Sequence, residues 1–468
     1  MNLTIIGAGS HRVLGILRGA LAVAGVLDGG EIRLCDRDVV RAEVMGRMLL
    51  KTPEQLRSGC RVVWGGDLDA ALDGADVVGV ILPASRPRSY TLGHEASYRD
   101  GFISSDNVSP NGALCAVKIG PTVLDIARRM EEHCPNAWLV NFVNPVAVLS
   151  GMVNHHTRIR CLGVCAGFTN HLWDIPRLLG RDELAQDLDV DTAGINHLSF
   201  ISRGSWQEED LFRALRRHLE AETKVGWKPP ELQPWRSTRQ KDNIRRSVLR
   251  LVRFWRELGV LIFSTEGDGM DHLMYEEAVE DYRSTYQAPS TGELERSLQR
   301  QGEERAEADR SFREWLDRDL DDAFWNEYGL TDPRFQRQDE DIFVRIFTGL
   351  AGVKETKIAT SRPNRGAIIG IKDRHVVEYS QFLFKDEIRP AGIYEIPDVV
   401  HGLTSSLASH QTLLGDALAE EDPHLLAQAL LAYPESSYSR PLRGLYKELF
   451  KFGEQEIKPS LARAIDFL

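Results

Sequence analysis

The sequence lacks the features that mark membrane, secreted and nucleic-acid-binding proteins. It has no continuous apolar run of the ~18 residues that a membrane-spanning helix needs. Its first residues contain no basic segment followed by an apolar stretch and a small-residue cleavage site. The 57 basic residues are outnumbered by 69 acidic ones, and the net charge of −12 disfavours binding to nucleic-acid phosphates. We therefore expect a cytoplasmic protein that binds neither membranes nor nucleic acids.

Cysteine is also scarce. Six cysteines in 468 residues do not resemble the disulfide framework of a secreted scaffold. Each cysteine is expected to be a small buried residue unless its neighbours indicate a metal. The content of 42% apolar and 27% charged residues is typical of a globular chain, and the length suits two domains.

The first part of the chain alternates between short apolar segments and helical segments. Continuous or alternating apolar residues predict strands at 3–6, 32–34, 62–64, 77–82 and 138–141. Strands that alternate with helices form a parallel sheet with right-handed crossovers. The pattern therefore predicts an α/β fold with a doubly wound, Rossmann-type parallel sheet.

The turn after the first strand is rich in glycine. Gly7 and Gly9, followed by Ser10, let the backbone tighten and approach a pyrophosphate at a helix N-terminus. Asp36 ends the second strand, where a carboxylate binds ribose hydroxyls and repels a 2′-phosphate. The third glycine of the usual fingerprint is absent, so the loop alone is a weak signal. Strand, turn, helix and terminal aspartate together predict binding of NAD rather than NADP.

Polar groups follow two later strands. Asn144 lies after the strand at 138–141, where open α/β sheets bind ligands, although an Asx turn would explain it equally well. Cys165 follows a β-like segment at 158–162, and His197 lies on a later segment. The two side chains can share a divalent metal that keeps positions open for substrate. From spacing alone, a buried cysteine and a hydrogen-bonded histidine are the commoner explanation.

Three further segments carry charged groups. Residues 266–272 combine carboxylates, an imidazole and glycines, which suits either an active-site loop or a solvated surface loop. Lys118 precedes a helix expected from Pro121 and is either a contact for an anionic ligand or a surface lysine. Residues 300–341 are dense in arginine and acidic residues, which favours exposed helices or a subunit rim over a ligand site.

Taken in order, these elements resemble glycoside hydrolase family 4 along nearly the whole chain. The glycine loop with Asp36 resembles the dinucleotide site, and residues 106–112 resemble the substrate loop. Residues 163–165 and 194–200 resemble the two metal-ligand segments. The resemblance implies a set of binding residues: NAD at Gly7, Gly9, Ser10, Asp36 and Asn144; a divalent metal, usually Mn²⁺, at Cys165 and His197; sugar hydroxyls at Asn111, Asn144 and Asn196.

The resemblance also implies an unusual reaction. NAD would take a hydride from C3 of the sugar, which acidifies the proton at C2. A base would remove this proton, the aglycone would leave from C1, water would add, and the hydride would return. The metal would act as a Lewis acid. The implied base is Asp268, Asp271 or His272, with Tyr275 a weaker candidate, and Lys118 would contact the substrate.

Two departures from the family pattern keep alternatives open. Ala166 stands where relatives carry Asp, Asn or His, and it cannot transfer a proton. Lys118 replaces an arginine and loses the bidentate fork. The segment around 266–272 resembles the galactosidase, glucosidase and uronidase branches more than the phospho-β-glucosidase branch. An NAD-dependent sugar dehydrogenase and a non-enzymatic NAD- or sugar-binding regulator are the alternative functions.

The resemblance completes the expected organisation. Residues 1–160 would form the NAD-binding domain. Residues 161–468 would form a mixed α+β domain, similar to that of lactate and malate dehydrogenases, that carries the metal, substrate and oligomer contacts. The partners would be a small glycoside and further copies of the chain in a homodimer or homotetramer. The sugar, its anomer and any phosphate or carboxylate on it stay open.

Overall fold

The computed structural model describes most of the chain: residues 1–165, 167–183, 188–223, 230–234, 236–262, 267–273, 291–325, 340–435 and 440–468. Ala166, Tyr275 and the side chain of Asp268 lie outside this part. Within the described residues, none of the helices is both long and apolar enough to cross a membrane.

The first half forms the predicted parallel sheet. Its strands pair in the order β3-β2-β1-β4-β5-β6, which is the Rossmann order. The strands are β1 (Asn2–Ile6), β2 (Glu31–Cys35), β3 (Arg61–Gly65), β4 (Val77–Val80), β5 (Trp138–Asn141) and β6 (Arg160–Gly163). The prediction of a doubly wound parallel sheet is thus confirmed. The carboxyl ends of all these strands meet at one edge of the sheet.

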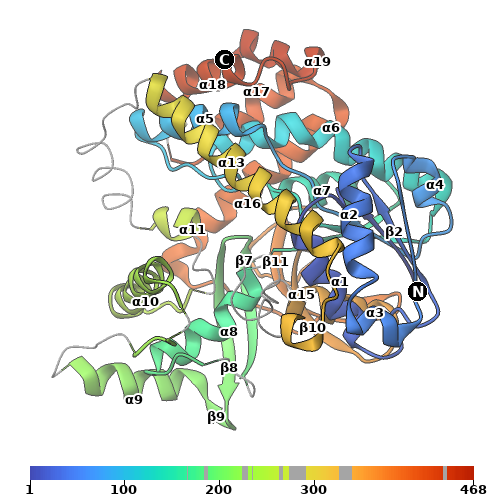
Figure 1. Cartoon of the computed structure of the whole chain (residues 1–468). Coiled ribbons are helices and arrows are strands. Elements are labelled where there is room, and N and C mark those ends of the chain that lie inside the picture. The colour runs from blue at the N-terminus through green and yellow to red at the C-terminus, as the bar shows by residue number, and fades with distance from the viewer. Residues whose placement is uncertain are drawn as a thin grey trace.

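Helices cover both faces of this sheet (Figure 1). The crossovers from β1 toward β3 and from β4 toward β6 run in opposite directions, so right-handed connections place their helices on opposite faces. The helices of this half are α1 (Arg12–Ala22), α2 (Val39–Leu49), α3 (Pro53–Ser58), α4 (Leu68–Leu72), α5 (Pro87–Arg99), α6 (Pro110–His133) and α7 (Val146–His156). Two later helices complete the layers: α15 (Glu340–Leu350) packs on α1, and α16 (Asp398–Glu420) packs on α6 and α7.

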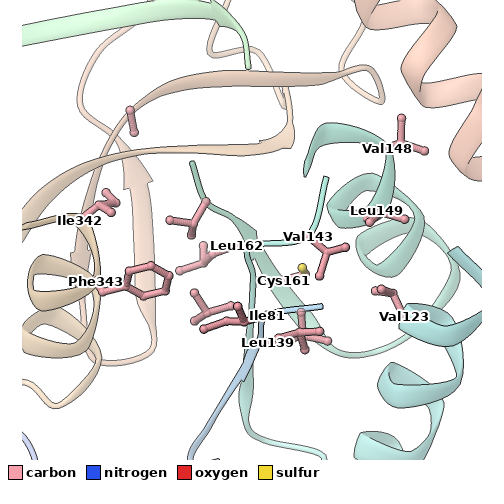
Figure 2. Packing of buried hydrophobic residues seen from close by; sticks show 14 of the residues in the cluster. Ile81, Val123, Leu139, Val143, Val148, Leu149, Cys161, Leu162, Ile342 and Phe343 are labelled. Atoms are coloured by element: carbon pink, nitrogen blue, oxygen red, sulfur yellow. The ribbon is translucent and has the colours of Figure 1, made fainter. Parts of the chain in front are cut away.

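Figure 2 shows the core beside the last parallel strands. Leu139 of β5 and Leu162 of β6 are fully buried. Val123 of α6 lies on one side of them and Phe343 of α15 on the other. The strands are buried on both faces, which explains their continuous apolar sequences.

The second half continues the same sheet with antiparallel strands. β6 pairs with β10, and the order then runs β10-β11-β7-β8-β9, with β12 on β11. These strands are β7 (Leu188–Ile195), β8 (Leu198–Trp206), β9 (Glu209–Asp210), β10 (Thr356–Pro363), β11 (Val376–Phe384) and β12 (Glu387–Pro390). The expected division after residue 160 falls at the start of β6 and stays a prediction.

The remaining helices that the structure describes follow β6 in the chain (Figure 1). They are α8 (Gly167–Leu178), α9 (Leu211–Thr223), α10 (Thr238–Leu258), α11 (Gly267–Asp271), α13 (Thr291–Leu316), α15 (Glu340–Leu350), α16 (Asp398–Glu420), α17 (Pro423–Leu431), α18 (Arg440–Phe452) and α19 (Pro459–Ala462). Of the charged segment at 300–341, residues 300–316 belong to α13 and are helical, as predicted, whereas residues 326–339 lie outside the described part of the chain.

The helix expected from Pro121 begins earlier, at Pro110. The Ser109 hydroxyl accepts a hydrogen bond from Gly112 N–H at 3.0 Å, and a proline in the first turn needs no N–H partner. These two signals favour a helix start at Pro110, and Pro121 lies inside the helix. As a consequence, Asn111 and Lys118 lie inside a helix and are buried, not in a loop before it.

Candidate active site

A cavity of 1820 Å³ opens at the edge of the sheet where the parallel strands end. Polar residues that follow several different strands line it, as expected for the ligand site of an open α/β sheet. Most of the residues that the sequence pointed to lie here. These are Gly7, Gly9, Ser10, Asp36, Asn144, Cys165 and His197.

The glycine loop is held against two neighbouring strands. Gly7 has a φ of +83°, and a Cβ there would lie 2.0 Å from the carbonyl oxygen of Ile81. Gly9 N–H donates to Asp36 at 2.8 Å, and Asp38 N–H donates to the other carboxylate oxygen at 2.9 Å. Asp36 thus shapes the loop while it lines the cavity. A carboxylate has about four acceptor sites, so two hydrogen bonds leave capacity for a ligand hydroxyl.

Cys165 and His197 come together in the lining of the cavity. The Cys165 Sγ lies 3.3 Å from the His197 Nε2. A thiolate and an imidazole on one zinc-type ion lie roughly 3.1–3.6 Å apart for ligand angles of about 90–109°. The separation therefore fits a shared metal ion. Among the described residues, no group of three or more His, Cys, Asp or Glu is arranged to hold a metal.

The local backbone places Cys165 and His197 at the ends of strands. Cys165 follows the end of β6, and it is the one cysteine of the six that is not buried. His197 lies in the turn between β7 and β8 and has a φ of +67°. A non-glycine residue in this region is uncommon and often marks a functional position. The remaining cysteines are small buried residues, as expected from composition.

Asn144 lies in the cavity beside Asp106, which the sequence analysis had not singled out. The Asn144 side-chain amide donates to Asp106 at 2.9 Å, and both residues line the cavity. This hydrogen bond fixes the orientation of the amide, so that its carbonyl oxygen and remaining N–H can meet a ligand. Asp106 belongs to the 106–112 segment, so that segment contributes to the cavity through its first residue.

Helix α11 packs directly against the turn that carries His197. A Cβ on Gly269 would lie 1.5 Å from the His197 carbonyl oxygen, so only glycine fits at this contact. Asp268 is the preceding residue in the same helix. The backbone of Asp268 therefore lies close to the turn that carries His197.

The other two candidate bases in this segment have partners elsewhere. Asp271 contacts Arg250 of α10. The imidazole of His272 contacts Glu435 through Nδ1 and lies 3.1 Å from the Val108 carbonyl oxygen through Nε2. Both ring nitrogens of His272 are therefore placed against oxygen atoms of the protein. This placement suits structural contacts better than base catalysis.

Lys118, Asn111 and Asn196 are not among the residues that line the cavity. The Asn111 amide donates to the Tyr90 carbonyl oxygen at 3.3 Å. Asn196 accepts from Asn107 at 2.6 Å and donates to Glu378 at 2.8 Å. The roles proposed for these three residues from the family resemblance stay predictions.

Lys118 lies in a buried polar cluster between α5, α6 and the C-terminal segment. Its ammonium donates to Ser85 at 2.9 Å and to Ser89 at 3.1 Å, and it lies 3.6 Å from a carboxylate oxygen of Glu456. Burial lowers the pKa of Lys118, and the nearby Glu456 opposes this shift. The geometry indicates that Lys118 ties the C-terminal segment to the core of the first half.

Replacement of Lys118 distinguishes this structural role from a catalytic one. We expect Lys118→Met to lower the free energy of unfolding by about 1–3 kcal/mol, because buried acceptors lose their donor. Activity of the folded variant should change little. Exposed Lys447→Met is the control for thermal unfolding. A large loss of activity at unchanged stability would instead support a direct role for Lys118.

Several cavity residues carried no signal in the sequence. His11 and Arg12 follow the glycine loop, and Arg37 and Arg41 follow Asp36. Helix α13 also lines the cavity, although its charged sequence favoured a solvated face. Its contribution depends on contacts between distant segments, which local periodicity cannot reveal. The residues of α13 concerned are Gln301, Glu304, Arg305 and Ala308.

Comparison with known proteins identifies the family. The model of the family 4 glycosyl hydrolases matches residues 2–178, and the model of the family 4 C-terminal domain matches residues 192–435. The chain belongs to glycosyl hydrolase family 4. The resemblance found in the motifs is thereby confirmed, and so is the assignment of the chain as an enzyme of the glycosidase class.

Individual family 4 proteins match at low identity. The alpha-galacturonidase of Thermoanaerobacter italicus is 22% identical over 98% of this chain and 97% of its own length. The alpha-galactosidase of Bacillus subtilis is 27% identical over 48% of this chain, a match that spans only 52% of that enzyme. A 6-phospho-alpha-glucosidase from gut microorganisms, solved with NAD and Mn²⁺, has a TM-score of 0.77 at 19% identity and covers 97% of this chain and 98% of its own. The structural match confirms the fold class.

Proposed function

We propose that this family 4 enzyme hydrolyses a glycoside with NAD and a divalent metal, Mn²⁺, in one cavity. The observation that carries the proposal is the shared cavity, which joins the glycine loop and Asp36 to the Cys165–His197 pair. The presence of NAD and Mn²⁺ in the related 6-phospho-alpha-glucosidase supports it. When bound, these groups supply a hydride acceptor for C3 of the sugar and a Lewis acid for the sugar oxygens.

The residues of the chain would bind and orient the reacting groups. The glycine loop and the N-terminus of α1 would hold the cofactor pyrophosphate, and Asp36 would bind the adenosine ribose. Cys165 and His197 would hold the metal and leave positions for two sugar oxygens. Asn144, held by Asp106, would orient a sugar hydroxyl or the nicotinamide end of the cofactor.

Asp268 is the residue we propose as the base that removes the C2 proton. Its neighbour Gly269 packs on the carbonyl of His197, so the backbone of Asp268 lies close in space to the turn that would carry the metal ligand. Asp271 and His272 are engaged with Arg250 and with Glu435 and Val108. A base adjacent to the metal would act where the metal-bound sugar is most acidic.

Asp36 provides a test of the cofactor site. We expect Asp36→Ala to weaken NAD binding by about ten- to a hundredfold, because it removes the ribose acceptor and two hydrogen bonds that shape the loop. Asp36→Asn keeps an acceptor but removes the charge, so it should relax the discrimination against NADP. Titration calorimetry with both cofactors measures these effects. Unaltered NAD affinity in Asp36→Ala would contradict the ribose role.

The substrate class is proposed from relatives that align along most of the chain. Enzymes named alpha-galacturonidase match 98%, 88%, 78% and 89% of its length. We therefore propose α-galacturonides as the first substrates to test, with α-galactosides and 6-phospho-glucosides as the comparison.

The decisive assay for this function compares glycoside cleavage with cofactor reduction. With NAD, Mn²⁺ and a thiol reductant present, we expect many cleavage events per NAD and no accumulation of NADH. One NADH formed per product molecule would indicate a sugar dehydrogenase instead. Absence of cleavage for every sugar in the panel would contradict the proposal.

A further inference from the structure

Helix α13 of the second half closes one side of the cofactor cavity. Gln301, Glu304, Arg305 and Ala308 of this helix line the cavity. Figure 1 shows α13 as a long yellow helix that runs diagonally across the molecule toward α1 and α2. It contacts α2 directly. The helix thus joins a part of the chain distant in sequence to the elements that surround the dinucleotide loop.

A small set of side chains fastens α13 to these elements. A carboxylate oxygen of Asp309 lies 2.8 Å from the His11 Nε2 and 3.1 Å from a guanidinium nitrogen of Arg41. The His11 ring stacks on Phe312, with centroids 4.7 Å apart and planes inclined by 8°. We refer to His11, Arg41, Asp309 and Phe312 as the α13 clasp.

The α13 clasp is well packed for a contact at the molecular surface. The side chains of His11 and Arg41 are each 16% exposed, and Phe312 is fully buried. Phe312 also packs against Trp315, with ring centroids 5.3 Å apart. Charge-assisted hydrogen bonds are stronger when they are partly shielded from water. The clasp therefore holds α13 more firmly than an exposed ion pair would.

The clasp residues lie next to the elements that would bind the cofactor. His11 lies directly before α1, at the helix N-terminus where a pyrophosphate would bind. Arg41 lies in the first turn of α2, just beyond Asp36. Asp309 bridges these two elements from outside the cavity, so the clasp spans the cofactor-binding edge. Opening of this side of the cavity requires these contacts to separate.

We propose that the α13 clasp retains NAD in the cavity between turnovers. The inference rests on the proposed function, in which the hydride taken from C3 returns to the sugar within the same cycle. The same NAD molecule then serves the next turnover, and its release is not a step of the cycle. A dehydrogenase, in contrast, must release its reduced cofactor each time. Slow release of NAD therefore does not slow this reaction, and it keeps the enzyme loaded for the next turnover.

The rate of cofactor release tests the clasp. The full-length protein is loaded with NADH, and fluorescence follows its displacement by excess NAD in a stopped-flow instrument. We expect NADH to leave Asp309→Ala at least about tenfold faster than the wild type, with Asp309→Asn between the two. Glu307→Gln is the matched control, because Glu307 pairs with Arg310 on the same helix and should leave release unchanged.

The possible results distinguish failure of the clasp proposal from failure of the proposed function. Equal release rates in the wild type and both Asp309 variants, with thermal unfolding unchanged, would overturn the clasp. Absence of NADH binding to the wild type would instead overturn the proposed function. A second readout follows activity after free NAD is removed by gel filtration. The wild type should keep its activity without added NAD, whereas Asp309→Ala should depend on fresh NAD.

Discussion

Cys165→Ser is expected to lose metal binding and at least about a thousandfold of the hydrolytic activity, while NAD binding is retained. Cys165 is one of the two ligands proposed for the metal, and its sulfur lies 3.3 Å from the His197 imidazole. A hydroxyl is a far weaker ligand than a thiolate, and His197 alone would not hold the ion. The glycine loop and Asp36 follow β1 and β2, whereas Cys165 follows β6, so the cofactor site should persist.

Metal content and NAD affinity are measured on the same preparations of Cys165→Ser. Cys60→Ser is the matched control, since the Cys60 thiol donates to the Gly30 carbonyl oxygen at 3.4 Å and a serine can do the same. The control should keep its metal and its activity. Unchanged activity of Cys165→Ser after treatment with a chelator would refute the metal assignment.

Gly269→Ala is expected to lower activity by at least about a hundredfold. The new Cβ would lie 1.5 Å from the His197 carbonyl oxygen, and this backbone atom cannot yield as a flexible side chain would. Either α11 moves away from the turn or His197 moves with it. Both displacements separate the metal ligand from the segment that carries Asp268. A misplacement of about 1 Å in an active site is enough for an effect of this size.

Gly302→Ala is the control for this substitution. Gly302 lies on α13, and a Cβ there would meet nothing within 4 Å. Alanine is favoured over glycine in helices by about 1 kcal/mol, so this variant should be as stable as the wild type or more so. If Gly269→Ala kept full activity and metal binding, the contact between α11 and the His197 turn would have no functional role.

Local sequence signals were sufficient for the cofactor half of the site. Gly7, Gly9 and Asp36 occur within one strand–turn–helix–strand unit, where neighbours in the chain are also neighbours in space. The alternation of apolar strands with helices then determines the strand order and the edge at which their ends meet. For this reason the doubly wound sheet and the cavity edge could be predicted without the structure.

The pairing of Cys165 with His197 as proposed metal ligands could be predicted only from the order of motifs. Neither Cys165 nor His197 has a ligand partner at close spacing, and a buried cysteine beside a hydrogen-bonded histidine was the commoner explanation. Their approach depends on the pairing of β6 with β10 and on the β7–β8 turn, which are distant in sequence. The structure supplies this juxtaposition.

Other side chains were misplaced because their partners lie far along the chain. Lys118 was expected in a loop near the substrate, but the capping Ser109 extends α6 toward the N-terminus, and Lys118 meets Glu456 instead. His272 meets Glu435, and Asp309 meets His11. Such long-range ion pairs leave no periodic trace in the sequence, so charge patterns alone indicated solvated surfaces.

The central claim is that cleavage proceeds through loss and return of the C2 proton while NAD is recycled. The most direct measurement is hydrolysis of an accepted glycoside in D₂O with NAD and Mn²⁺, followed by NMR spectroscopy of the released sugar. We expect deuterium at C2 in nearly every product molecule, without net formation of NADH. Product that retains protium at C2 throughout would contradict it.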